Sequence, residues 1–89
     1  MNIKDHGLPI AAVTQMTGIS SHTLRKWESR YSLVTPERTS TGRRLYTQNN
    51  IEKLVLVREL TSRGHQVRLL ADLTNEELEE LLSLSLIHI

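Results

Sequence analysis

Gly18 separates two short segments with the spacing of amphipathic helices, and this pattern limits the fold more than any other feature. In the first segment Ile10, Val13 and Met16 recur at helical spacing. Gly18 is expected to end this helix, because glycine adopts the left-handed conformation without strain. One serine of the Ser-Ser pair that follows can cap a second helix by accepting a backbone N–H hydrogen bond. The sequence therefore predicts two helices joined by a turn of about three residues.

The second helix has two chemically different faces. Leu24, Trp27 and Tyr31 fall at positions i, i+3 and i+7, so they form one apolar stripe that we expect to anchor the helix to the core. The polar residues that lie away from this stripe are Thr23, Arg25, Lys26, Ser29 and Arg30. This helix can therefore pack through its rings while it presents cations to a partner.

The segment 35–46 interrupts the helical pattern. Pro36 and the cluster Ser-Thr-Gly mark turns, and the Arg44-Leu45-Tyr46 stretch reads as extended backbone. These features predict a small hairpin that is too short to be stable alone. We expect Tyr46 to lie in the core.

Helices are predicted again after the hairpin. Thr47 caps a long one that ends near Gly64, with a broad buried stripe of Ile51, Leu54, Val55, Val57 and Leu60. A short helix is expected around residues 67–73. In the last helix Thr74 is the cap and Glu77 its capping-box partner. We assign residues 1–82 to one domain and treat residues 83–89 as a tail that is disordered or left by cloning or a truncated boundary.

Composition limits the function. A chain of 89 residues is one small domain, and the absence of Cys excludes disulfides and fits a reducing cytoplasm. No apolar run reaches the ~20 residues needed to span a bilayer. Residues 1–46 carry a charge balance of +4 and residues 47–89 one of −3. This asymmetry indicates that one face meets a polyanion.

The order of three motifs resembles that of the MerR-type transcription regulators. The motifs are "IAAVTQMTGISSHTLRKWESR", "PERTSTGRRLY" and "IEKLVLVRELTSRG", and the resemblance runs from about Leu8 to Leu73. It implies a mainly α fold, a winged helix-turn-helix with a small β-hairpin wing and additional C-terminal helices. The Trp-Glu-x-Arg-Tyr motif is most similar to the branch whose longer members have cobalamin-binding or light-responsive C-terminal domains. In that branch Gly usually follows the Tyr, whereas this chain has Ser32.

The resemblance also implies which residues contact DNA. Arg25 can donate two hydrogen bonds to guanine O6 and N7, and Lys26 suits a phosphate or guanine. The start of the helix can hold a phosphate, and the wing can grip the backbone beside the major-groove site. The expected DNA-binding residues are His22, Thr23, Arg25, Lys26, Arg30, Arg38, Arg43 and Arg44, and the structural anchors are Leu24, Trp27, Tyr31 and Tyr46. In a second interpretation of the cations, they are solvated and Arg25 pairs with Glu28.

The predicted function is sequence-specific binding of double-stranded DNA. In the resembled family a long C-terminal helix forms the homodimer, and we find no such helix here, so we expect this chain to be a monomer. No cofactor is expected in it, although cobalamin fits a C-terminal domain of a longer protein. Neither a catalytic pair nor metal-ligand spacing is visible, so we expect no enzyme and no metal. Two alternatives remain, an excisionase-like factor that bends DNA and a small helical protein-interaction module.

Overall fold

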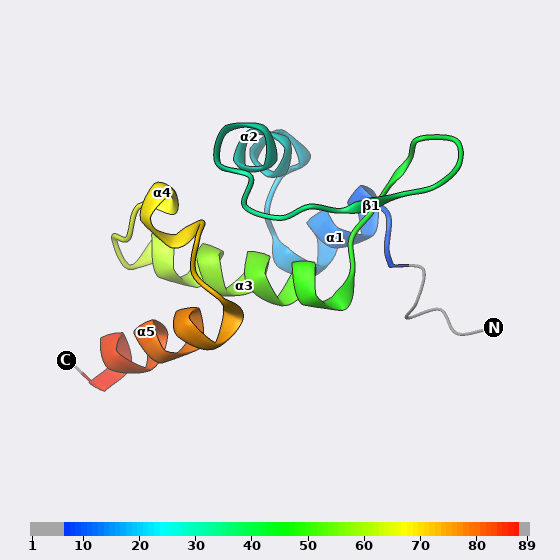
Figure 1. Cartoon of the computed structure of the whole chain (residues 1–89). Helices are drawn as coiled ribbons and strands as arrows, with labels where there is room; N and C mark the ends of the chain where they lie inside the picture. The colour runs from blue at the N-terminus through cyan, green and yellow to red at the C-terminus, as the bar shows by residue number, and fades with distance from the viewer. Residues whose placement is uncertain (1–6, 88–89) are drawn as a thin grey trace.

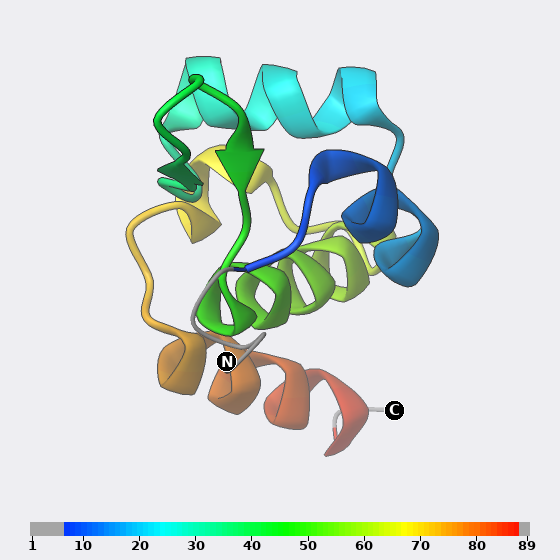
Figure 2. The same ribbon diagram turned by 90° about the vertical axis from the view of Figure 1, so that its right-hand side faces the viewer.

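The computed structural model describes residues 7–87, and within them it contains five helices and one two-stranded antiparallel sheet (Figure 1). The long helix α3 lies in the middle, with α2 on one side of it and α5 on the other, as both views show (Figure 2). The elements in chain order are α1 (Ile10–Thr17), α2 (Ser21–Tyr31), β1 (Glu37–Arg38), β2 (Arg44–Leu45), α3 (Gln48–Ser62), α4 (Val67–Leu70) and α5 (Asn75–Ile87).

The turn between α1 and α2 has the predicted chemistry. Gly18 takes a left-handed conformation with φ of 76°, and its N–H donates to the Thr14 carbonyl over 2.9 Å. The Ser20 hydroxyl accepts from the Thr23 N–H at 3.1 Å and so caps α2. In α1 the inward face differs from the prediction, because Thr17 is buried and Met16 is exposed. Thr17 is tolerated there because its hydroxyl donates to the Val13 carbonyl.

The end of α2 shows how the chain accommodates Ser32 at the position where Gly is usual. Ser32 has φ of 50° and ψ of 40°, which is the left-handed region. The Ser32 N–H donates to the Glu28 carbonyl at 3.1 Å, which is the 5→1 bond of the αL motif, and the Leu33 N–H donates to the Trp27 carbonyl at 3.4 Å. The backbone therefore keeps the conformation that favours glycine, although a side chain is present.

The predicted hairpin is confirmed. Glu37 pairs with Leu45 and Arg38 with Arg44, and the loop is closed by a hydrogen bond from the Thr39 N–H to the Arg43 carbonyl. Tyr46 extends the sheet by one bridge, since its backbone exchanges two hydrogen bonds with Leu8. The hairpin is therefore attached to the segment that precedes α1.

Helix α3 supplies the centre of the core. Thr47 and Asn50 form a capping box at its start, and Ile51, Leu54, Val57 and Leu60 are buried. Val55, which the sequence analysis placed in the buried stripe, is 41% exposed. The buried residues follow a spacing of three, so the inward stripe is narrower than the apolar content of the helix suggests.

Helix α5 covers the side of α3 opposite α2. The predicted capping box is confirmed, because the Thr74 N–H donates to the Glu77 carboxylate and the Glu77 N–H donates to the Thr74 hydroxyl. Leu78 is fully buried, and Leu81 and Leu82 pack against the core. The helix continues to Ile87. Residues 83–87 are therefore helical, although the sequence analysis placed them in a tail that is disordered or left by cloning or a truncated boundary. The rest of that tail, residues 88–89, lies outside the described residues.

Candidate nucleic-acid interface

The outward face of α2 concentrates polar and cationic side chains. A shallow hollow on this face is lined by five exposed residues, His22, Arg25, Lys26, Ser29 and Arg30. Thr23, also expected at this surface, is half-buried at the first turn, where its hydroxyl lies 3.0 Å from that of Ser20. Three cations on one helix make this face strongly attractive to an anion.

The inward face of α2 attaches the helix to the core. Leu24 is 1% exposed, and Trp27 is half-buried and packs against the core cluster. Tyr31 is also half-buried. Tyr46 lies fully within the core. The helix is therefore anchored mainly by Leu24 and Trp27, and less by the ring at its end.

The hairpin arginines have different environments. Arg43 is exposed, and Arg38 is exposed while its guanidinium donates to the Gly42 carbonyl over 3.0 Å within the loop. Arg44 is half-buried and forms an ion pair with Glu28, with 3.0 Å between Nε and Oε1. A second hollow, between the start of α1, the hairpin and α2, is lined by Pro9, Ile10, Arg25, Gly42, Arg43 and Arg44. The structure therefore brings Arg25 of α2 together with two hairpin arginines.

Glu28 is a residue whose role the sequence analysis missed. Its carboxylate accepts from Arg44 Nε at 3.0 Å and from the Tyr46 hydroxyl at 2.8 Å. The predicted alternative, a pair between Glu28 and Arg25, is therefore replaced by a pair with Arg44. The available signal was helical spacing, because Glu28 follows Leu24 by four residues and so lies on the inward face.

Tyr46 stays protonated as a donor to this carboxylate. Burial, the hydrogen bond to Glu28 and the charge of that residue raise the pKa of Tyr46 to about 12. A phenol with this pKa is neutral throughout the physiological range. Tyr46 and Arg44 therefore both act as donors to Glu28 at neutral pH.

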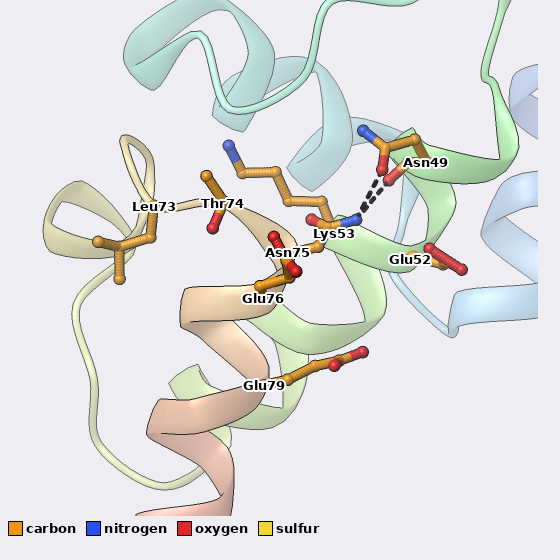
Figure 3. A pocket seen from close by; sticks show the side chains of 8 residues that line it. All are labelled: Asn49, Glu52, Lys53, Leu73, Thr74, Asn75, Glu76 and Glu79. Carbon is orange, nitrogen blue, oxygen red and sulfur yellow. Dashed lines mark hydrogen bonds between the residues drawn. The ribbon is translucent and has the colours of Figure 1, made fainter.

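The opposite side of the molecule carries acids. A hollow between α3 and the start of α5 has Glu52, Glu76 and Glu79 on its lining, and the Asn75 amide bridges it by donating to the backbone and side-chain oxygens of Asn49 (Figure 3). The Lys53 amine, whose pKa is lowered by burial, donates to a backbone carbonyl at 2.7 Å. This hollow would repel a polyanion, so the cationic surface of α2 and the hairpin is the candidate site.

Two absences within residues 7–87 bear on other functions. No group of three or more His, Asp and Glu side chains is placed to hold a metal ion among these residues. In the same range no helix combines the length and the apolar character that crossing a bilayer requires.

Comparison with known proteins agrees with the fold. The model of a family described as "MerR HTH family regulatory protein" matches residues 8–83. The chain is 32% identical to the HTH-type transcriptional repressor CarH of Myxococcus xanthus over 72 residues, which cover 81% of this chain and 24% of that protein. It is 36% identical to the HTH-type transcriptional regulator GlnR of Bacillus anthracis over 56 residues, which cover 63% of this chain and 43% of that protein. It is 34% identical to the HTH-type transcriptional regulator MlrA of Escherichia coli K12 over 58 residues, which cover 65% of this chain and 24% of that protein.

The chain therefore spans less than half the length of these relatives. These relatives are named as transcription regulators, which is a class of DNA-binding proteins and not of enzymes. Because the family model covers most of the chain, this protein belongs to the MerR family of helix-turn-helix regulatory proteins.

Proposed function

We propose that this chain is the N-terminal domain of a MerR-type regulator and binds double-stranded DNA sequence-specifically, with α2 in the major groove and the hairpin on the flanking backbone. The observation that supports this most is the distribution of charge over the fold. Helices α2 and α5 lie on opposite sides of α3 (Figure 2). The cations of α2 and the exposed Arg43 line hollows beside α2, whereas acids occupy the first turn of α5. A polyanion therefore has one favourable face to approach.

The geometry of α2 suits a major groove. The groove of B-DNA admits one α-helix, and the 11 residues of α2 span about 16 Å. We assign base reading to Arg25, because a guanidinium can donate two parallel hydrogen bonds to guanine. Lys26 serves a phosphate or a guanine, and His22 and Thr23 hold a phosphate at the helix start.

The flanking contacts come from exposed arginines at the end of α2 and in the hairpin. Arg30, Arg38 and Arg43 are exposed, so they can reach phosphates beside the groove. Such contacts position the domain and increase affinity for every sequence alike. Arg44 was expected in this group, but it is half-buried and forms an ion pair with Glu28.

Assembly and cofactor use are proposed from the family. A longer chain would dimerise through a C-terminal helix, whereas this chain would be a monomer, because the Leu78, Leu81 and Leu82 stripe of α5 is already used against the core. A cobalamin-binding C-terminal domain in a longer protein rests only on the resemblance of the Trp-Glu-x-Arg-Tyr motif. A cytoplasmic location is proposed for the same class of regulator.

The proposal is tested by the salt dependence of binding to a labelled random-sequence duplex. With about four phosphates neutralised, log K should fall with log salt at a slope of about −3.6. Lys26→Gln should reduce the magnitude of the slope by about 0.9 if Lys26 holds a phosphate. Arg63→Gln is the matched control, since Arg63 follows the end of α3 and pairs with Glu59, and it should leave the slope unchanged. A slope near zero would contradict DNA binding and favour the protein-interaction module.

A further inference from the structure

Every hydrogen bond that joins α2 to residues 37–46, within the part of the chain that the structure describes, is accepted by Glu28. The two donors are Arg44 Nε, at 3.0 Å, and the Tyr46 hydroxyl, at 2.8 Å. Arg44 belongs to β2, and Tyr46 follows it directly. One carboxylate on the helix therefore holds the strand of the hairpin that leads into α3.

The position of this acid needs a physical reason. A carboxylate on a helix that approaches DNA repels phosphates if it points outward. Glu28 instead points inward, where its side chain is only 13% exposed. A carboxylate so far removed from water is stable only when donors satisfy it, and both carboxylate oxygens have one here.

The hairpin itself offers little else to fix its orientation. Both residues of β1 are exposed and both residues of β2 are only half-buried. A two-stranded sheet of this length is not stable alone. The base of the hairpin is attached by the backbone bridge between Tyr46 and Leu8, just before α1, and by the Tyr46 side chain in the core.

We propose that Glu28 is a positioning residue that holds the hairpin against α2, so that Arg25 and Arg43 meet DNA as one surface, and that Arg44 serves this contact instead of binding a phosphate. The inference rests on the proposed DNA-binding function. The hollow that Arg25, Arg43 and Arg44 share lies where α2 and the hairpin approach each other, so its shape depends on the Glu28 contact. The Arg44 charge is compensated by Glu28 and contributes little to the phosphate contacts.

The charge of Glu28 allows a decisive test, because two explanations predict opposite changes in DNA affinity for Glu28→Gln. If Glu28 is only an acid near the interface, Glu28→Gln removes a repulsive charge and raises DNA affinity. If it is a positioning residue, the same change lowers the affinity for a duplex obtained by selection from a random library, by about fivefold or more. Glu80→Gln is the matched control, because it removes one exposed charge from α5 and should not lower affinity. A rise in affinity for Glu28→Gln would overturn the proposal.

Two further variants test the donors. Tyr46→Phe removes one hydroxyl without a change of charge, so it should weaken binding in the same direction, and its effect should not add to that of Glu28→Gln. It also provides the test if Glu28→Gln does not melt cooperatively. Arg44→Gln should weaken binding but leave the salt slope unchanged. A slope smaller by about 0.9 would show that Arg44 binds a phosphate and would overturn that part of the proposal.

A measurement without DNA separates this inference from the proposed function. In NMR spectra of the 89-residue chain, the Arg44 Nε–Hε group should give a protected cross-peak that is lost in Glu28→Gln, together with shifts of the hairpin amides. Unchanged hairpin resonances in a folded Glu28→Gln would refute the inference even if the chain binds DNA. If the wild-type chain shows these NMR features but binds no duplex, the proposed function fails and the contact itself stands.

Discussion

Replacement of Ser32 by glycine should stabilise the domain. Ser32 ends α2 with φ of 50° and ψ of 40°, and no hydrogen bond of its side chain is present among the described residues to offset the strain. The left-handed conformation costs a residue with a Cβ about 1–2 kcal/mol, whereas glycine adopts it freely. Glycine also raises the conformational entropy of the unfolded chain, which offsets roughly 0.5–1 kcal/mol of the gain. With mid-range values for both terms, the net increase in the free energy of unfolding should be about 0.5–1 kcal/mol.

Thermal unfolding followed by circular dichroism measures this effect. For a domain of this size the gain corresponds to a rise in Tm of about 2–8 °C. Ser29→Gly is the control in the same helix, because glycine in a helix interior destabilises by roughly 0.5–1 kcal/mol and should lower Tm. If Ser32→Gly left Tm unchanged or lowered it, the strain assigned to Ser32 would be refuted.

Three other changes follow from the packing and the titration of the core. Trp27→Ala should lower the free energy of unfolding by about 2–3 kcal/mol in urea titrations, below the range for a fully buried ring because Trp27 is half-buried; a loss of DNA binding without a loss of stability would make it a contact residue. Leu78→Ala should lower the free energy of unfolding by about 2–5 kcal/mol, because Leu78 is buried, whereas Leu84→Ala, at an exposed position, should lower it by less than about 0.5 kcal/mol. Equal effects would mean that α5 does not pack as described. The pKa of Tyr46 is about 10 in the unfolded chain and about 12 in the folded chain, so above pH 10 deprotonation favours the unfolded state. Up to about 2–3 kcal/mol of the free energy of unfolding should therefore be lost between pH 10 and about 12. Tyr46→Phe should show a smaller loss in the same urea titrations, and an identical loss would contradict the raised pKa.

Features decided by nearby residues could be predicted from the sequence. The ends of the helices depend on hydrogen bonds within a few residues, and Gly18, Ser20, Thr47 and Thr74 all occupy the expected positions. The hairpin was also predictable, since its turn residues are local signals.

Features decided by contacts between distant segments were missed. Periodicity alone places Met16 and Val55 inward, but in the structure both are exposed and Thr17 is buried. Helical spacing from Leu24 places Glu28 on the inward face, but its partners Arg44 and Tyr46 are 16 and 18 residues away, so no local pattern identifies them. The same contact changes the interpretation of Arg44, which the motif alone presents as one more cation of the wing.

The assignment of α2 to base reading is tested most directly by comparing Arg25→Ala with Arg43→Ala on two duplexes, one selected for tight binding and one of random sequence. Arg25→Ala should reduce binding to the selected duplex by about 1–3 kcal/mol, relax the preference at one base pair and change binding to random DNA much less. Arg43→Ala should weaken binding to both duplexes by similar factors, as expected for a phosphate contact. Equal losses on both duplexes for Arg25→Ala would contradict base reading by α2 and leave Arg25 as a phosphate contact.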